Sequence, residues 1–181
     1  CYLIDVPTKD IQNTLPQVHV LGRGQVMHVS PEYSVLIDYA HNGVSFESII
    51  STVEQYNPNK LIVVYGSGGK RSKTRRYESG EVVAKHGGYS ILTADNPRGE
   101  KIVDICKDIV VGIDKYHGEY TIIPDRKEAI YHALDMAHKG DVVLLLGKGH
   151  ETYMIGEDEV TRHFSETEVL EEYKKERGLN A

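Results

Sequence analysis

The sequence predicts a Rossmann-like, doubly wound α/β fold with a mostly parallel sheet and an antiparallel edge. Short apolar runs bounded by Gly, Pro, Asn or Asp have the length of buried strands; they lie at residues 60–65, 89–94, 120–123 and 141–146. Helical patterns alternate with them, at residues 44–56, 74–86, 100–113 and 126–138. This alternation of strand and helix is typical of a parallel sheet covered by helices on both faces.

The first part of the chain predicts an addition to one edge of the sheet. Residues 1–15 show no strong periodicity and are interpreted as a linker or a remnant of a preceding domain, and residues 16–181 as one domain. Strand-like runs at 18–20, 25–29 and 34–37 are separated by turn residues, which favours a small antiparallel extension.

The last part of the chain predicts a cover over the sheet. Residues 152–155 and 159–163 flank a turn at Gly156-Glu157-Asp158 and predict a hairpin. A helix is predicted to begin at Ser165, with Glu168 completing a capping box.

Composition narrows the class of protein. The chain has 181 residues, a net charge of -6 and no apolar run near the roughly 20 residues that cross a bilayer, so neither a nucleic acid nor a membrane is expected as a partner. Its two cysteines, without a secretory leader, favour a cytoplasmic location. The nine histidines carry no metal-binding spacing, and no metal site is inferred.

Polar segments follow the predicted strands where their carboxyl ends meet, which is where open parallel sheets bind ligands. These segments are Asp38-Tyr39-Ala40-His41-Asn42, 66–76, Asp95-Asn96-Pro97-Arg98, Asp125-Arg126 and Gly147-Lys148-Gly149-His150-Glu151. Taken singly, Asp38 or Asp125 could be an ordinary helix cap and Pro97 a helix start. Their shared position instead favours one rim around a ligand.

Two of these segments indicate the chemistry of that ligand. The glycines of residues 66–69, followed by Lys70, Arg71, Arg75 and Arg76, suit an anion, either phosphate or carboxylate. Arg98 can bind a carboxylate through two parallel hydrogen bonds, and Asn96 can donate a further hydrogen bond to it. Glu151 supplies a negative charge on the neighbouring loop. This combination suits a zwitterion, namely an amino acid. The alternative is that Arg98 pairs with a local acid on the surface.

Together these segments, with Gly22-Arg23 before them, resemble the Mur ligase family from about Leu15 to Tyr173. The resemblance implies the C-terminal domain of a three-domain ATP-dependent ligase of peptidoglycan synthesis, and thus of cell-wall biogenesis. The Asp-Asn-Pro-Arg form is similar to that of the tripeptide synthetases that add meso-diaminopimelate to UDP-MurNAc-L-Ala-D-Glu. Lanthionine or another diamino dicarboxylic acid would satisfy the same residues.

The resemblance also implies a role for each matching residue. Arg23 and His41 would approach the ATP phosphates, Asp38 would bind the ribose and Asn42 would support that loop. The amino acid would be held by a second set, namely Arg76, Asp95, Asn96, Arg98, Gly147 and Glu151. No residue of this chain would be catalytic by itself.

The cofactors follow from the same resemblance. ATP and Mg²⁺ would serve the full-length enzyme, held by a preceding central ATPase domain, because this chain contains no G-x-x-x-x-G-K-[ST] segment. We expect neither to bind this chain tightly, and we expect the chain alone to be inactive.

Departures from the family pattern leave other functions open. Leu21, Gly43, Lys70 and Tyr77 stand where the family commonly has other residues, and they concentrate on the nucleotide side. A divergent paralogue with another acceptor, or a non-catalytic amino-acid-binding module, is therefore an alternative. A Rossmann oxidoreductase is disfavoured because the glycine spacing is wrong.

Overall fold

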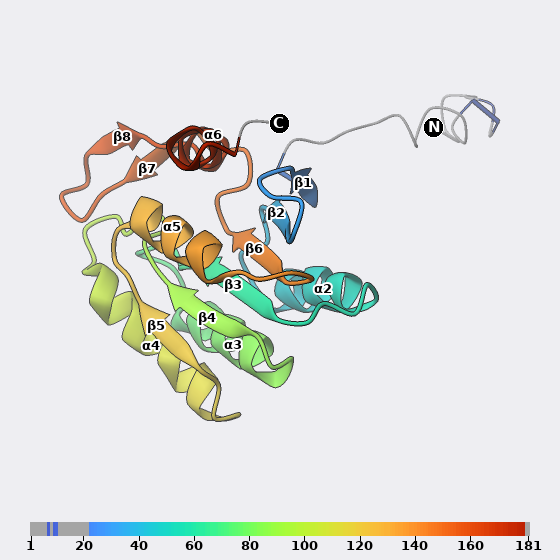
Figure 1. Cartoon of the computed structure of the whole chain (residues 1–181). Coiled ribbons are helices and arrows are strands. Elements are labelled where there is room, and N and C mark those ends of the chain that lie inside the picture. Colours follow the sequence, from blue (N-terminus) through green and yellow to red (C-terminus); the bar gives the residue numbers. More distant parts are fainter. Residues whose placement is uncertain (1–6, 8, 11–21, 180–181) are drawn as a thin grey trace.

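The computed structural model describes residues 7, 9–10 and 22–179 (Figure 1). The predicted strand at 18–20 and most of the predicted linker at 1–15 lie outside these residues. The division of the chain at residue 16 therefore stays a prediction.

A sheet with the strand order β1-β2-β6-β3-β4-β5 forms the centre of the molecule (Figure 1). Its strands are β1 (Gln25–Met27), β2 (Ser34–Asp38), β3 (Leu61–Tyr65), β4 (Tyr89–Leu92), β5 (Tyr120–Ile122) and β6 (Val142–Leu146). All neighbours pair in parallel except β1, which pairs antiparallel with β2 in the register Gln25 to Ile37. The predicted fold class, with its antiparallel edge, is confirmed.

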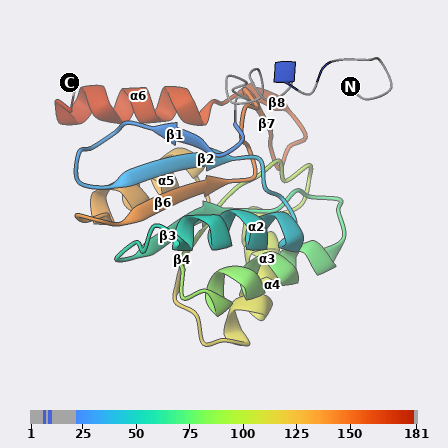
Figure 2. The same cartoon turned by 90° about the vertical axis from the view of Figure 1, so that its right-hand side faces the viewer.

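Helices cover both faces of this sheet (Figure 2). On one face lie α2 (Gly43–Glu54), α3 (Lys73–Lys85) and α4 (Ile102–Asp114), and on the other lie α5 (Arg126–Met136) and α6 (Glu166–Arg177). Successive side chains of a strand point to opposite faces, so Val143 packs with α5 and α6 while Leu144 packs with the other three helices. Because both faces are covered, β3 and β6 are buried throughout and are apolar at every position.

The helix starts differ in part from the simplest interpretation of the sequence. Asn42, rather than Asp38, caps α2, because its side chain accepts from Ser45 N and Ser45 reaches back to the cap. Asp125 caps α5 as an ordinary N-cap residue. Helix α4 begins at Ile102, so Pro97 belongs to the preceding turn and does not start a helix.

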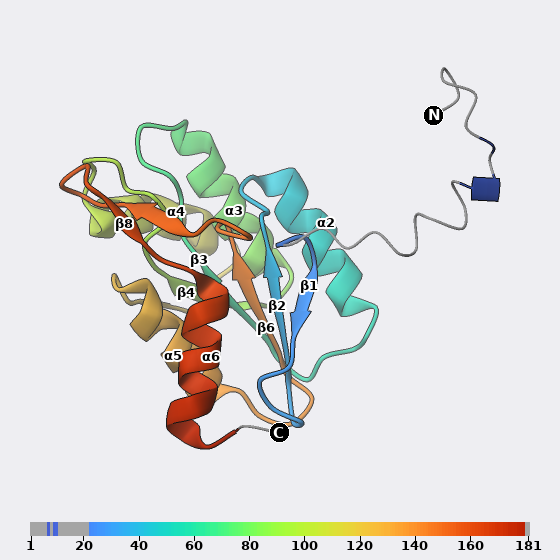
Figure 3. The ribbon, with the colours of Figure 1, turned by 90° about the horizontal axis from the view of Figure 1, so that it is seen from above.

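The predicted hairpin and last helix are both present, and the helix packs on one face of the sheet. Strands β7 (Tyr153–Ile155) and β8 (Thr161–His163) pair antiparallel, and α6 then runs beside α5 (Figure 3). Ser165 caps α6 by accepting from Glu168 N. The predicted capping box is only half formed, because the Glu168 carboxylate contacts His163 Nε2 at 2.6 Å instead of returning to the cap.

Candidate functional site

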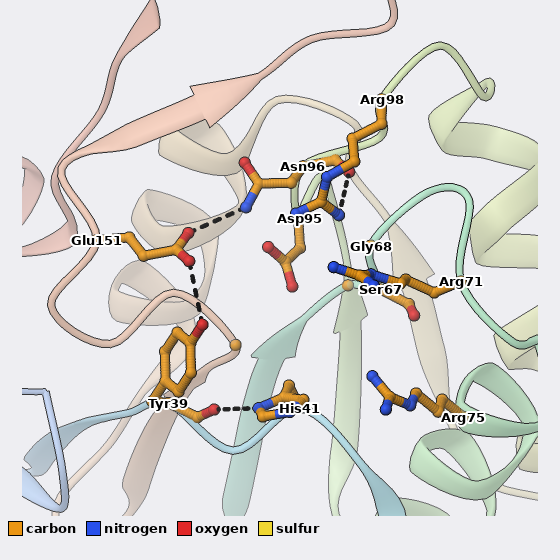
Figure 4. Close-up of a pocket in the computed structure, with 12 residues that line it drawn as sticks. Tyr39, His41, Ser67, Gly68, Arg71, Arg75, Asp95, Asn96, Arg98 and Glu151 are labelled. Carbon is orange, nitrogen blue, oxygen red and sulfur yellow. Dashed lines mark hydrogen bonds between the residues drawn. The ribbon is translucent and has the colours of Figure 1, made fainter. Parts of the chain in front are cut away.

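A cavity of about 200 Å³ lies at the carboxyl edge of the sheet, among the loops after β2, β3, β4 and β6 (Figure 4). Its lining residues are Tyr39, His41, Gly66, Ser67, Gly68, Arg71, Arg75, Asp95, Asn96, Arg98, Gly147 and Glu151. The fold therefore brings residues far apart in the sequence into one small polar chamber, as parallel sheets do at this edge.

Opposite charges occupy opposite walls of this cavity. Glu151 and the Tyr39 ring lie on one side, Arg71 and Arg75 lie on the other, and Asp95 stands between them (Figure 4). A guanidinium group suits a carboxylate and a carboxylate suits an ammonium group. The cavity is thus polarised for a small molecule that carries both charges.

The Glu151 carboxylate is held by three side chains. It accepts from Lys148 Nζ at 2.7 Å, from Asn96 Nδ2 at 3.0 Å and from Tyr39 Oη at 3.3 Å. Burial alone would raise the pKa of Glu151, but hydrogen bonds from Lys148 and Asn96 outweigh burial and hold that pKa below its usual value. Glu151 is therefore ionised at neutral pH and presents a fixed anion.

The turn at residues 95–98 has an uncommon backbone conformation. Asn96 and Arg98 both have positive φ, 46° and 49°, and Gly69 N donates to Asn96 O at 3.0 Å. This geometry sends the Arg98 guanidinium back over Gly68, where an added Cβ would lie 2.7 Å from Arg98 Nη1. Arg98 Nη1 also donates to Asn96 O at 3.4 Å, and among the described residues no acid forms an ion pair with Arg98.

Gly147 is required where β6 ends. Its φ of 109° disfavours any residue with a side chain, and an added Cβ would lie 2.9 Å from Asp95 Oδ2. The missing side chain therefore leaves room for the Asp95 carboxylate on the cavity wall.

Arg76, which the sequence analysis assigned to the amino acid, is buried and is not among the lining residues of the cavity. Its side chain is 1% exposed, and its guanidinium is bound to Glu100 at 2.8 Å and Asp108 at 2.9 Å. Arg76 therefore does not line the cavity; it joins α3 to α4 from behind the glycine loop. Arg71 and Arg75, from the same basic run, line the cavity. The assignment of Arg76 to the amino acid stays a prediction.

The residues predicted to serve ATP divide into two groups. His41 lines the cavity, and the exposed Arg23 lies over the Tyr39 ring at 4.9 Å. Asp38 and Asn42 have scaffold contacts: Asp38 accepts from Gly24 N at 2.6 Å and from Ala40 N at 2.7 Å, and Asn42 caps α2. Their roles toward ATP stay predictions.

Asp125-Arg126 does not line the cavity, contrary to the predicted common rim of polar segments. Arg126 is instead buried, donating to Ala94 O and Leu146 O, each at 2.8 Å, and to Glu166 Oε1 at 2.8 and 3.0 Å. Burial raises the pKa of Glu166, and the charge of Arg126 opposes that shift. Arg126 thereby holds together the ends of β4 and β6, from which two of the cavity loops begin.

Sequence reasoning missed several site residues. Lys148 and Tyr39 lie inside motifs that the sequence displays, yet a motif alone does not tell which of its side chains turns inward. Arg71 and Arg75 were predicted as cations of an anion-binding loop, but they were not assigned to the amino acid. The serine at position 67 carried no distinguishing signal.

Two general properties of the described residues bear on the class of protein. Within the parts that the structure covers, no helix is long and apolar enough to cross a membrane. Over the same residues, no group of three or more His, Cys, Asp or Glu side chains is arranged to hold a metal ion.

The fold and the cavity together define a doubly wound α/β domain with a charged chamber at the edge of its sheet. The family described as Mur ligase, glutamate ligase domain, matches residues 22–149. The chain belongs to the Mur ligase family, which confirms the resemblance predicted from the motifs.

Two relatives show which members of the Mur ligase family this chain is similar to. The UDP-N-acetylmuramoyl-L-alanyl-D-glutamate--2,6-diaminopimelate ligase of Caldanaerobacter subterraneus subsp. tengcongensis is 40% identical over 169 residues, covering 93% of this chain and 35% of that protein. The ligase of the same name from Clostridium perfringens is 40% identical over 171 residues, with the same shares.

A solved structure of a ligase of that name superimposes with a TM-score of 0.80 at 28% identity, covering 98% of this chain and 36% of that one. The chain thus spans about a third of the length of the proteins it matches.

Proposed function

We propose that this chain is the amino-acid-binding domain of an ATP-dependent ligase that adds meso-diaminopimelate, or a diamino dicarboxylic acid of similar reach, to UDP-MurNAc-L-Ala-D-Glu. The observation that carries this proposal is the polarised cavity, with Arg71, Arg75 and Arg98 facing Glu151 across Asp95. The names of the relatives, 2,6-diaminopimelate ligases, support the same assignment.

The chemistry of such a ligase defines what this domain contributes. ATP transfers its γ-phosphoryl group to the carboxylate of the precursor, and the amino group of the diamino acid then displaces phosphate to form the amide. This chain would hold the amino acid and orient its amine, a contribution that can lower a barrier by several kcal/mol. ATP and Mg²⁺ would be bound mainly by a central ATPase domain, with Arg23 and His41 approaching the phosphates.

Selectivity for a dicarboxylic substrate would rest on Arg98. Its guanidinium can bind the second carboxylate, which lysine lacks, and lysine would leave that partly buried cation without a negatively charged partner. Glu151 would bind an ammonium group at the opposite wall.

The test is ligation kinetics of the full-length protein with Arg98→Ala. We expect the KM for meso-diaminopimelate to rise about tenfold to a hundredfold, since a hydrogen bond to a charged group is lost. The preference over lysine should fall with it. Arg177→Ala is the matched control, because that exposed arginine pairs with Asp135 on α5, away from the cavity lining. Unchanged selectivity in Arg98→Ala would exclude this role.

Calorimetry on this chain alone tests separately whether it binds the amino acid while another domain binds ATP. We expect weak binding of meso-diaminopimelate and no tight binding of ATP, since most of the nucleotide site would belong to another domain. Tight ATP binding by the isolated chain would contradict the proposal.

A further inference from the structure

Lys148 is buried directly beside the cavity without lining it. Its side chain is 0% exposed, and its ammonium donates to Glu151 Oε2 at 2.7 Å, to Asn96 Oδ1 at 3.3 Å and to the backbone oxygen of Tyr153. An ammonium group has three donors, and all three are thereby used. Lys148 therefore has none left for a ligand and can act only through the groups it holds.

The first of these groups is the Asn96 amide. Its oxygen accepts from Lys148 Nζ and also from Ile155 N at 2.9 Å. Turning the amide over would set its NH₂ group against two donors, so only one orientation is compatible with these neighbours. The nitrogen is consequently the atom that faces Glu151, and Asn96 meets the cavity as a donor.

The second group is the Glu151 carboxylate, on which Lys148 places a full positive charge. Tyr39 and Asn96 add neutral donors, while burial opposes ionisation. The other charged or titratable groups around this carboxylate and cavity are Asp95, Tyr153, His41, Arg71, Arg75 and Arg98. Among the described residues that hydrogen-bond to the Glu151 carboxylate, Lys148 is the one with a formal charge.

We propose that Lys148 is a positioning residue that prepares the cavity before the amino acid arrives, by fixing Glu151 as an ionised acceptor and Asn96 as a donor. The benefit to binding rests on the proposed function, because Glu151 and Asn96 are the side chains assigned to the amino acid. The hydrogen bonds that fix these two side chains do not depend on that function. The orientations would be set whether or not an amino acid is the ligand.

A ligand-free measurement tests the inference by itself. The carboxyl carbon of Glu151 is titrated by NMR in the wild-type chain and in Lys148→Met, with Glu151→Gln used to assign the resonance. We expect the pKa of Glu151 to rise by about one pH unit or more in Lys148→Met, because an adjacent cation is removed. An unchanged pKa would overturn the proposal.

A second measurement connects the same residue to binding. The chain is titrated with meso-diaminopimelate at several pH values and followed by NMR chemical shifts. We expect Lys148→Met to bind about tenfold more weakly, with the loss of binding at acidic pH moved to higher pH. A residue that only fills space would not move that pH profile. Lys127→Met is the control, because its ammonium pairs with Glu172 at the surface.

The outcomes separate the two proposals. If the wild-type chain does not bind meso-diaminopimelate at all, the proposed function loses its support, while the titration of Glu151 still decides the role of Lys148. If wild type binds and Lys148→Met binds equally well with the same pH profile, only the role of Lys148 is excluded.

A further variant covers the case in which Lys148→Met does not fold. Lys148→Met with Glu151→Gln leaves no unpaired buried carboxylate. In that double variant we expect the Asn96 side-chain amide protons to exchange with solvent faster than in Glu151→Gln alone. Equal exchange would overturn the proposal.

Discussion

Replacing Arg126 with Met should destabilise the whole domain, because Arg126 joins three elements that meet under the cavity. Both Arg126 and Glu166 have side chains that are 0% exposed. The guanidinium also donates to Ala94 O and Leu146 O, at the ends of β4 and β6. The substitution would leave a buried carboxylate and two buried carbonyl oxygens without this partner.

The magnitude follows from these contacts. Removing one partner of a buried ion pair costs about 3–5 kcal/mol, which is a large part of the roughly 5–15 kcal/mol of a typical domain. Replacing both residues, as in Arg126→Met with Glu166→Leu, should be less costly than Arg126→Met alone, because no unpaired charge remains. Some loss should persist, since the oxygens of Ala94 and Leu146 still lack a donor.

Urea unfolding of the chain measures these differences as shifts in midpoint at constant slope. Lys127→Met is the matched control on the same helix, because its ion pair with Glu172 lies at the surface, where solvent screens the attraction. A free energy of unfolding for Arg126→Met within about 1 kcal/mol of the wild-type value would contradict this prediction. A double variant less stable than Arg126→Met would contradict it as well.

Three further predictions concern other parts of the molecule. Burial lowers the pKa of His86, but hydrogen bonds to Glu54 and Glu47 outweigh burial and raise that pKa. The stability that this shift contributes is complete below the unfolded-state pKa of about 6.5 and is lost as pH rises through the folded-state pKa. Thermal unfolding of His86→Gln should therefore show a smaller loss of stability between about pH 6 and 8 than the wild-type chain shows. Gly147→Ala should cost about 1–3 kcal/mol and weaken meso-diaminopimelate binding by displacing Asp95, whereas Gly24→Ala, with nothing within 4 Å of the added Cβ, should leave binding intact; equal binding losses in calorimetry would contradict this. Burial raises the pKa of Cys106 to about 12, so in a Cys1→Ser background a thiol reagent should label the chain only after unfolding, and rapid labelling of the native chain would refute the burial.

Much of the fold was predictable because it depends on local patterns. The apolar runs that became β3 and β6 are unbroken, as strands buried on both faces require, and the intervening helices carry apolar residues at helical spacing. Predicted element ends differed from the structure by a residue or two. The exact first residue of a helix depends on which nearby polar residue caps it, as Asn42 does for α2.

The site was predictable only as a set of loops. Arg75 and Arg76 are adjacent in the sequence, and successive residues of a helix point about 100° apart. One of them therefore faces the cavity while the other turns toward Asp108 of α4. Which one does so depends on where α3 begins and on how it packs against α4, and neither is visible in a basic run.

The sequence by itself determined the fold class, the family and the segments that reach the carboxyl edge of the sheet, because these follow from periodicity and from motifs contiguous in the chain. The tertiary structure alone decided which side chains of those segments meet. Lys148 reaches Asn96, and Arg126 reaches Leu146 and Glu166, although these residues are distant in the sequence and meet only after folding. Such contacts depend on the order of strands in the sheet, which brings β6 between β2 and β3.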